Sequence, residues 1–254
     1  MSLVVVAIGP GATVQDHGRR GFMHLGVPRG GALDEGLFAR VQRSLGNAPD
    51  AAAVELPWHG ATFRADAPLV VSVDGDVRAL AAGETLRVDP ARYAVRYVGV
   101  RGGVEVPVTL GGRGTLLVAG LGGLDGRMLR KGDVLPCGAR VVGAVEAPDA
   151  WAADDDAIEL MPCTGAPAVC VEALRDGAFV VTTRVDRVGM RLHGDAPRGL
   201  AAGVSVPLVR GAVEVTPDGE LIVMGPDHPT TGAYPLVGVV TRRGQRAAEV
   251  GKDV

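Results

Sequence analysis

The chain has 254 residues, and its 26 lysine and arginine residues against 29 aspartate and glutamate residues give a formal net charge of −3. This balance provides no broadly basic surface of the kind that nucleic-acid binding favours. Apolar residues make up 47% of the chain, which excludes intrinsic disorder for most of it. We therefore expect one large domain or two smaller globular domains that do not bind nucleic acid.

No association with a membrane or with metal is expected. The first apolar run, 3–8, is far shorter than the about 20 residues of a spanning helix, and it lacks the basic leader of a signal peptide. Cys137, Cys163 and Cys170 show no CxxC spacing, which argues against disulfides and structural zinc. The five histidines show no paired-ligand spacing. These features favour a cytoplasmic protein without a metal site.

Two helices are predicted along the chain. The first covers 34–45, where the apolar residues form one stripe, Asp34 can act as the N-cap and Gly46 ends the helix. A weaker helical pattern covers 168–176 and ends at Gly177. We expect everything else to be strand or turn.

Valine-rich runs between glycine, proline and aspartate residues predict many short strands with tight turns. With 38 glycines, this pattern is typical of a barrel or a sandwich. The acidic segment 143–157 lacks strand alternation and is interpreted as a connector or an exposed loop. A hairpin turn is predicted at 216–219. Strands are predicted over 69–73, 77–81, 93–98, 204–209, 213–215 and 221–224.

The first polar segment, 13–21, places Gln15, Asp16 and Arg19 between glycines. Glycine allows sharp turns and a close approach of the backbone to a ligand, and an arginine can clamp a carboxylate, carbamate or phosphate. The simpler interpretation, a solvated turn with one structural ion pair, stays open. Asp16 could pair with Arg19 in either case.

Two further glycine-rich segments are weaker candidates. In 25–34, paired glycines before the predicted helix allow main-chain N–H groups to face an anion. There, Asp34 is better explained as a helix cap than as a catalytic base. The segment 120–133 matches neither a P-loop nor a dinucleotide fingerprint, so a long turn explains it as well as a binding loop does.

The last polar segment, 225–235, lies between two valine-rich strands. Its hydroxyl and N–H groups, including those of Thr230, Thr231 and Tyr234, could stabilise a substrate oxyanion. His228 is its titratable group. The alternative is a rigid loop in which Tyr234 packs against one end of a barrel.

The order of these segments resembles the signature of the allophanate hydrolase subunit 2 family. This family is also called biotin-dependent carboxyltransferase-like or urea amidolyase-related, and it includes the C subunit of 5-oxoprolinase. The resemblance is carried by six blocks in series that span nearly the whole chain. They are TVQDHGRRGFMHLGVPRGGALD (13–34), LGNAPDAAAVEL (45–56), RGGVEVPVTLGGRGT (101–115), GGLDGRMLRKGD (122–133), RVGMRLHG (187–194) and PTTGAYP (229–235).

The resemblance implies a mainly β, cyclophilin-like β-barrel architecture with two subdomains and few short helices, covering residues 1–254 as one carboxyltransferase-like domain. It also implies an allophanate hydrolase subunit 1-like partner and, in 5-oxoprolinase systems, a lactam-utilisation subunit. The expected activity is ATP-dependent hydrolysis of a small amide or lactam, with ATP acting at the level of the complex. The alternatives are a non-catalytic regulatory binding protein and a carboxyltransferase half that uses carboxybiotin carried on another protein.

Segment polarity and the resemblance together suggest roles for eight residues. One hypothesis places two walls of a site at one end of a barrel, the first from the N-terminal segments and the second from 228–234. Glycine stands at positions 112 and 114, where the family carries hydroxyl groups, which favours the regulatory alternative. The predicted catalytic residues are Asp16, Arg19 and Thr231, and the predicted substrate-binding residues are Gln15, Asp34, Thr230, Tyr234 and His228.

Overall fold

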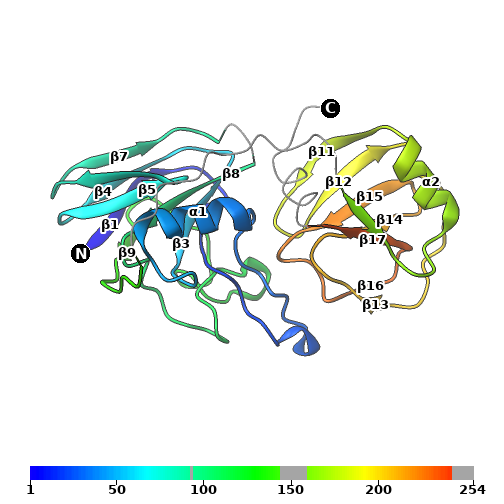
Figure 1. Cartoon of the computed structure of the whole chain (residues 1–254), viewed down its shortest axis with the longest axis horizontal. Coiled ribbons are helices and arrows are strands. Elements are labelled where there is room, and N and C mark those ends of the chain that lie inside the picture. The colour runs from blue at the N-terminus through cyan, green and yellow to red at the C-terminus, as the bar shows by residue number, and fades with distance from the viewer. Residues whose placement is uncertain (92–93, 144–158, 242–254) are drawn as a thin grey trace. The chain divides into compact units, whose positions relative to one another are not determined.

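The computed structural model describes residues 1–91, 94–143 and 159–241 (Figure 1). The chain divides into two compact units. The N-terminal unit holds residues 1–20 and the described part of 30–152, and the C-terminal unit holds 21–29 and the described part of 153–254. Apart from Gly143, the predicted connector lies outside the described residues.

Two antiparallel sheets form the N-terminal unit. The four-stranded sheet contains, in spatial order, β7 (Thr85–Val88), β4 (Ala61–Ala65), β1 (Ser2–Ile8) and β9 (Val134–Pro136). The five-stranded sheet contains β2 (Thr13–Gln15), β3 (Ala53–Pro57), β8 (Val95–Val100), β5 (Leu69–Val73) and β6 (Asp76–Leu80). Both sheets contribute to one core, in which Leu3 and Phe63 of the first sheet pack with Val71 and Val98 of the second.

Helix α1 (Glu35–Leu45) packs against the five-stranded sheet through Phe38, Val41 and Leu45. Its N-cap is Asp34, whose side chain accepts a hydrogen bond from the main chain three residues on, as predicted. The helix ends at Gly46 in the left-handed conformation, with φ of 66°. Two short 3₁₀ turns, η1 (Met23–Leu25) and η2 (Leu117–Ala119), lie in loops of the chain.

The C-terminal unit is built on a six-stranded antiparallel sheet. Helix α2 (Ala168–Asp176) packs on one face of it, as Cys170 joins Val213 and Val237 in a core cluster. The sheet contains, in spatial order, β10 (Leu160–Pro162), β17 (Leu236–Val240), β14 (Ala212–Val215), β15 (Glu220–Met224), β12 (Gly189–Gly194) and β11 (Phe179–Val185). A separate two-stranded ribbon pairs β13 (Val206–Pro207) with β16 (Thr231–Gly232).

The mainly β fold, both helices and the hairpin at 216–219 are confirmed, since Val215 pairs with Leu221 across that turn. The strand predicted over 204–209 is wrong in length. Only Val206–Pro207 forms β13, because its partner strand β16 is only two residues long. The cyclophilin-like barrel stays a prediction. Within the described ranges, no helix is long and apolar enough to cross a bilayer.

Candidate functional site

Asp16 follows directly after β2 and binds main-chain amides from a distant loop. Its Oδ1 accepts hydrogen bonds from the N–H groups of Gly18 (2.8 Å) and Gly114 (3.0 Å), and its Oδ2 accepts one from Arg113 (2.5 Å). The side chain is buried, with 4% exposure. Asp16 therefore fixes the loop around Gly114. Its predicted role as a base is untested by this geometry.

Arg19 holds the same loop through its carbonyl groups. Its Nε donates to the Thr109 carbonyl (3.0 Å), and its Nη2 donates to the Gly114 carbonyl. The residue is 1% exposed, so the interpretation of a solvated turn is wrong. The bonds of the Asp16 carboxylate go to main-chain amides, not to Arg19, because each residue satisfies a different side of the same loop. A clamp on a substrate carboxylate stays a prediction.

A glycine makes room for this arginine. A Cβ at Gly122 would lie 2.1 Å from Nη2 of Arg19 and 2.1 Å from the carbonyl oxygen of Gly114. Because Gly122 has no side chain, the glycine-rich segment 120–133 can pack directly against Arg19 of the first polar segment. Contacts between residues far apart in the chain thus bring together the segments 13–21 and 120–133, which the sequence analysis treated as separate candidates.

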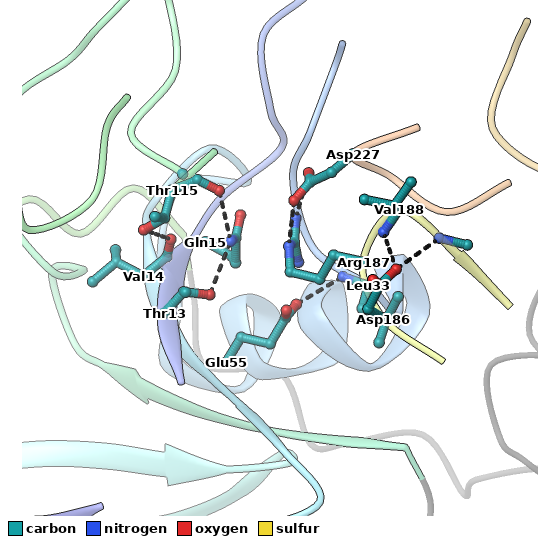
Figure 2. Close-up of polar contacts among 12 residues, drawn as sticks. Thr13, Val14, Gln15, Leu33, Glu55, Thr115, Asp186, Arg187, Val188 and Asp227 are labelled. Carbon is teal, nitrogen blue, oxygen red and sulfur yellow. Dashed lines mark hydrogen bonds and ion pairs between the residues drawn. The ribbon is translucent and has the colours of Figure 1, made fainter. Parts of the chain in front are cut away.

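Gln15 is fully buried at the end of β2 (Figure 2). Its Nε2 donates to the Thr13 hydroxyl (2.9 Å) and to the Thr115 carbonyl (3.0 Å), which fixes the orientation of the amide because a carbonyl can only accept. Its Oε1 is buried and has no hydrogen-bond partner among the described residues. Gln15 therefore has one acceptor without a partner among the described residues, and its predicted role in substrate binding stays a prediction.

The N-terminus of α1 does face an anion, but the anion is the chain's own Glu55. The Leu33 N–H donates to Glu55 Oε2 (2.7 Å; Figure 2), and the Tyr97 hydroxyl donates to the same oxygen (2.6 Å). The Asp34 N–H in turn donates to the Tyr97 hydroxyl oxygen (3.0 Å). Burial, followed by the charges of Glu55 and Asp34, raises the pKa of Tyr97 well above its usual value. The interpretation of Asp34 as a helix cap is confirmed, and a role in substrate binding stays a prediction.

Arg187 and Asp227 form a largely buried ion pair in the C-terminal unit (Figure 2). Arg187 donates from Nε (2.8 Å) and Nη2 (2.9 Å) to the two carboxylate oxygens, and the Asp227 N–H donates back to the Arg187 carbonyl (2.9 Å). Asp186 shapes the turn that carries Arg187, since its carboxylate accepts from the Val188 N–H (2.8 Å). This fork geometry rigidly joins the β11–β12 turn to the segment that follows β15.

His228 is a buried side chain in this segment, with 2% exposure. Its Nδ1 lies 2.6 Å from the Pro229 carbonyl oxygen, so Nδ1 carries the proton. Burial lowers the pKa of His228, while the Pro229 carbonyl and the Asp227 charge oppose that effect. Its predicted role in substrate binding is untested.

Thr230, Thr231 and Tyr234 lie on or beside the β13–β16 ribbon. Thr231 is exposed, and Tyr234 is 39% exposed, so the phenol is not buried against the sheet. The Leu208 N–H donates to the Thr230 carbonyl (3.0 Å). The ribbon therefore fixes the main chain and leaves the Thr231 side chain available to a ligand.

The eight predicted site residues fall into two groups. Gln15, Asp16, Arg19 and Asp34 belong to the N-terminal unit, and His228, Thr230, Thr231 and Tyr234 belong to the C-terminal unit. Within the first group, the Ala32 N–H donates to the Asp16 carbonyl (2.9 Å) and links the first two polar segments. Whether both groups serve one site stays a prediction.

Four further polar residues were not predicted from the sequence: the buried Glu55, Tyr97 and Glu214, and the largely buried Arg187. The available signal was an acidic residue inside an apolar strand, as in Val-Glu-Leu around Glu55 and Val-Glu-Val around Glu214. Both glutamates are buried, with exposures of 1% and 3%. Buried carboxyl groups are uncommon unless they are paired or functional. Within the described part of the chain, no cluster of three or more potential ligands could hold a metal ion.

Residues 25–249 match the family model described as carboxyltransferase domain, subdomain A and B, and the chain belongs to this family. The C subunit of 5-oxoprolinase from Escherichia coli (strain K12) is 29% identical over 260 residues, which cover 94% of this chain and 84% of that protein. A urea amidolyase of Lachancea kluyveri is 33% identical over 145 residues, which cover 50% of this chain and 8% of that protein.

A solved structure has the same fold over nearly the whole chain. The crystal structure of TTHA0988 matches with a TM-score of 0.87 at 29% sequence identity, over 99% of this chain and 54% of that one. The present chain thus spans about half the length of TTHA0988. The resemblance to this family is confirmed by the family model and by the sequence relatives.

Proposed function

We propose that the chain is one subunit of an ATP-dependent amide or lactam hydrolase of the 5-oxoprolinase type. The observation that carries the proposal is the similarity to the C subunit of 5-oxoprolinase across 94% of this chain. Because that relative is named as one of several lettered subunits, it supports a multi-subunit assembly. The proposed partners are an allophanate hydrolase subunit 1-like protein and a lactam-utilisation subunit, and ATP acts at the level of that complex.

In this proposal, the C-terminal unit contributes donors to the substrate carbonyl. The exposed Thr231 hydroxyl and the neighbouring main-chain N–H groups would stabilise the oxyanion that develops as the amide carbonyl is attacked. Thr230 and Tyr234 would orient the lactam ring of the substrate. His228 carries a proton on Nδ1, so Nε2 is the ring nitrogen that can offer an acceptor to a ligand.

The N-terminal unit, taken by itself, holds a rigid polar cluster around Gln15, Asp16 and Arg19. Gln15 Oε1, a buried acceptor without a partner among the described residues, would accept an N–H group of the substrate. Arg19 would hold a carboxylate or a carboxyphosphate-like group, with Asp16 keeping the surrounding loop in place. Asp34 would contribute to substrate binding from its position as the N-cap of α1.

The experiment that tests this function is reconstitution with both partner subunits from the same genome. Purified complex is supplied with 5-oxoproline and ATP, and glutamate formation is measured alongside ADP release. Turnover that requires all three subunits supports the proposal. A stable complex with no ATP-dependent lactam cleavage contradicts it and supports the regulatory alternative.

Carboxyl transfer is a second candidate, because the matched family is described as a carboxyltransferase domain and a urea amidolyase is among the relatives. Carboxybiotin would then arrive on another protein. Transfer of labelled carboxyl from a carboxylated biotin carrier to urea, without lactam cleavage, would favour this candidate.

A further inference from the structure

Glu214 lies in the middle of the central strand β14, where an apolar residue is expected. The strand alternates, so that Val213 and Val215 face the core beneath α2 while Glu214 points to the opposite face. The residue is 3% exposed. The small core cluster on that opposite face consists of Leu208, Ala212 and Met224, with Ile222 and Leu236 packed against it.

The Glu214 carboxyl group contacts the segment that carries the candidate oxyanion donors. The Tyr234 N–H donates a hydrogen bond to it. A Cβ at Gly232 would lie 2.1 Å from Glu214 Oε1, so the carboxyl group occupies the space that the glycine leaves open. Oε1 has no hydrogen-bond partner among the residues that the structure describes.

Stability alone does not explain a carboxyl group at this place. Burial raises the pKa of Glu214, and the single Tyr234 amide only partly opposes this effect. Its neighbours across the sheet, Ile222 and Leu236, carry no charge. An apolar side chain of similar volume would avoid the cost of burying a carboxylate with one donor.

We propose that Glu214 is a positioning residue, which holds the segment 230–234 through the Tyr234 amide and the open face of Gly232. It thereby fixes the main chain that presents the Thr230 and Thr231 hydroxyl groups. The effect of Glu214 on catalysis rests on the proposed function, whereas its contact with the segment 230–234 does not depend on that function. Glu214 acts through this segment and does not itself touch the substrate.

Two substitutions separate positioning from stability. Glu214→Gln retains an oxygen that can accept from the Tyr234 N–H, whereas Glu214→Leu fills the same space without an acceptor. Glu220→Gln in the neighbouring strand β15 is the control, since Glu220 pairs with Arg184 and Arg191. Each variant is studied as the full chain, alone for hydrogen exchange and melting temperature and within the reconstituted complex for turnover.

The proposal predicts opposite effects of Glu214→Leu on stability and function. Its melting temperature should equal or exceed that of the wild type, while amide exchange in the 229–235 peptide becomes faster and kcat falls about tenfold or more with a smaller change in KM. Glu214→Gln should restore slow exchange and most of kcat. The control should leave exchange in 229–235 unchanged.

Unchanged exchange in 229–235 for Glu214→Leu would overturn the proposal, and so would a kcat that falls only in step with the melting temperature. If the wild-type complex cleaves no lactam, the proposed function fails. In that case the exchange measurements alone still decide whether Glu214 positions the segment.

Discussion

Replacing Asp16 with alanine should detach the loop around Gly114. The three main-chain N–H groups that Asp16 accepts come from Gly18, Arg113 and Gly114. Hydrogen bonds to a charged group contribute about 1.5–3 kcal/mol each, and a buried donor left unpaired costs about 1–3 kcal/mol. Since the hydrogen bond from Gly114 is buried and those from Gly18 and Arg113 are only partly buried, we expect a loss of about 3–5 kcal/mol in the free energy of unfolding.

Urea denaturation followed by circular dichroism measures this loss, and hydrogen exchange of the 109–115 peptide shows where it occurs. At a slope of about 2–3 kcal/mol per molar urea, the midpoint should fall by roughly 1–2 M. The matched control is Asp89→Ala, because the Asp89 side chain is 75% exposed and should change stability by no more than about 0.5 kcal/mol. An Asp16→Ala protein within about 1 kcal/mol of the wild type, with the loop still protected, would refute this reasoning.

Three further outcomes are expected. Asp227→Ala should destabilise the chain by about 3–5 kcal/mol in urea denaturation, because it removes the carboxylate that the largely buried Arg187 side chain binds through two oxygens. A loss below about 1 kcal/mol would contradict this. Thr231→Val should lower kcat of the reconstituted complex about 100-fold with little change in melting temperature, since the side chain is exposed; unchanged kcat would remove the hydroxyl from the mechanism. Because the pKa of Glu214 is raised on folding, wild-type stability should fall relative to Glu214→Leu as the pH rises above its ordinary value of 4.5, and the difference should stop changing with pH below that value. A difference that grows as the pH falls would contradict this assignment.

Local signals in the sequence predicted the regular elements well. The helix over 34–45 carries its own start and stop signals, an N-cap aspartate and a C-terminal glycine, and both act as expected. The hairpin at 216–219 is likewise encoded by adjacent residues. The length of β13 was overestimated because a valine-rich run does not show how long its partner strand is.

The candidate site could be predicted only by residue type, because its contacts join residues far apart in the chain. Asp16 meets amides 97 and 98 residues away, and Arg19 meets carbonyl groups 90 and 95 residues away. The short spacing of Asp16 and Arg19 suggested an ion pair, whereas the fold directs both toward one glycine-rich loop. Glu214 was missed because strand alternation alone does not show what covers a central strand.

The most direct test of the proposed function is turnover of 5-oxoproline by the reconstituted complex, with and without this chain. We predict ATP-dependent formation of glutamate that requires the chain and that drops sharply when Thr231 is replaced by valine. An assembled complex in which the chain is dispensable for that reaction, or in which it only suppresses the activity of its partners, would contradict the proposal.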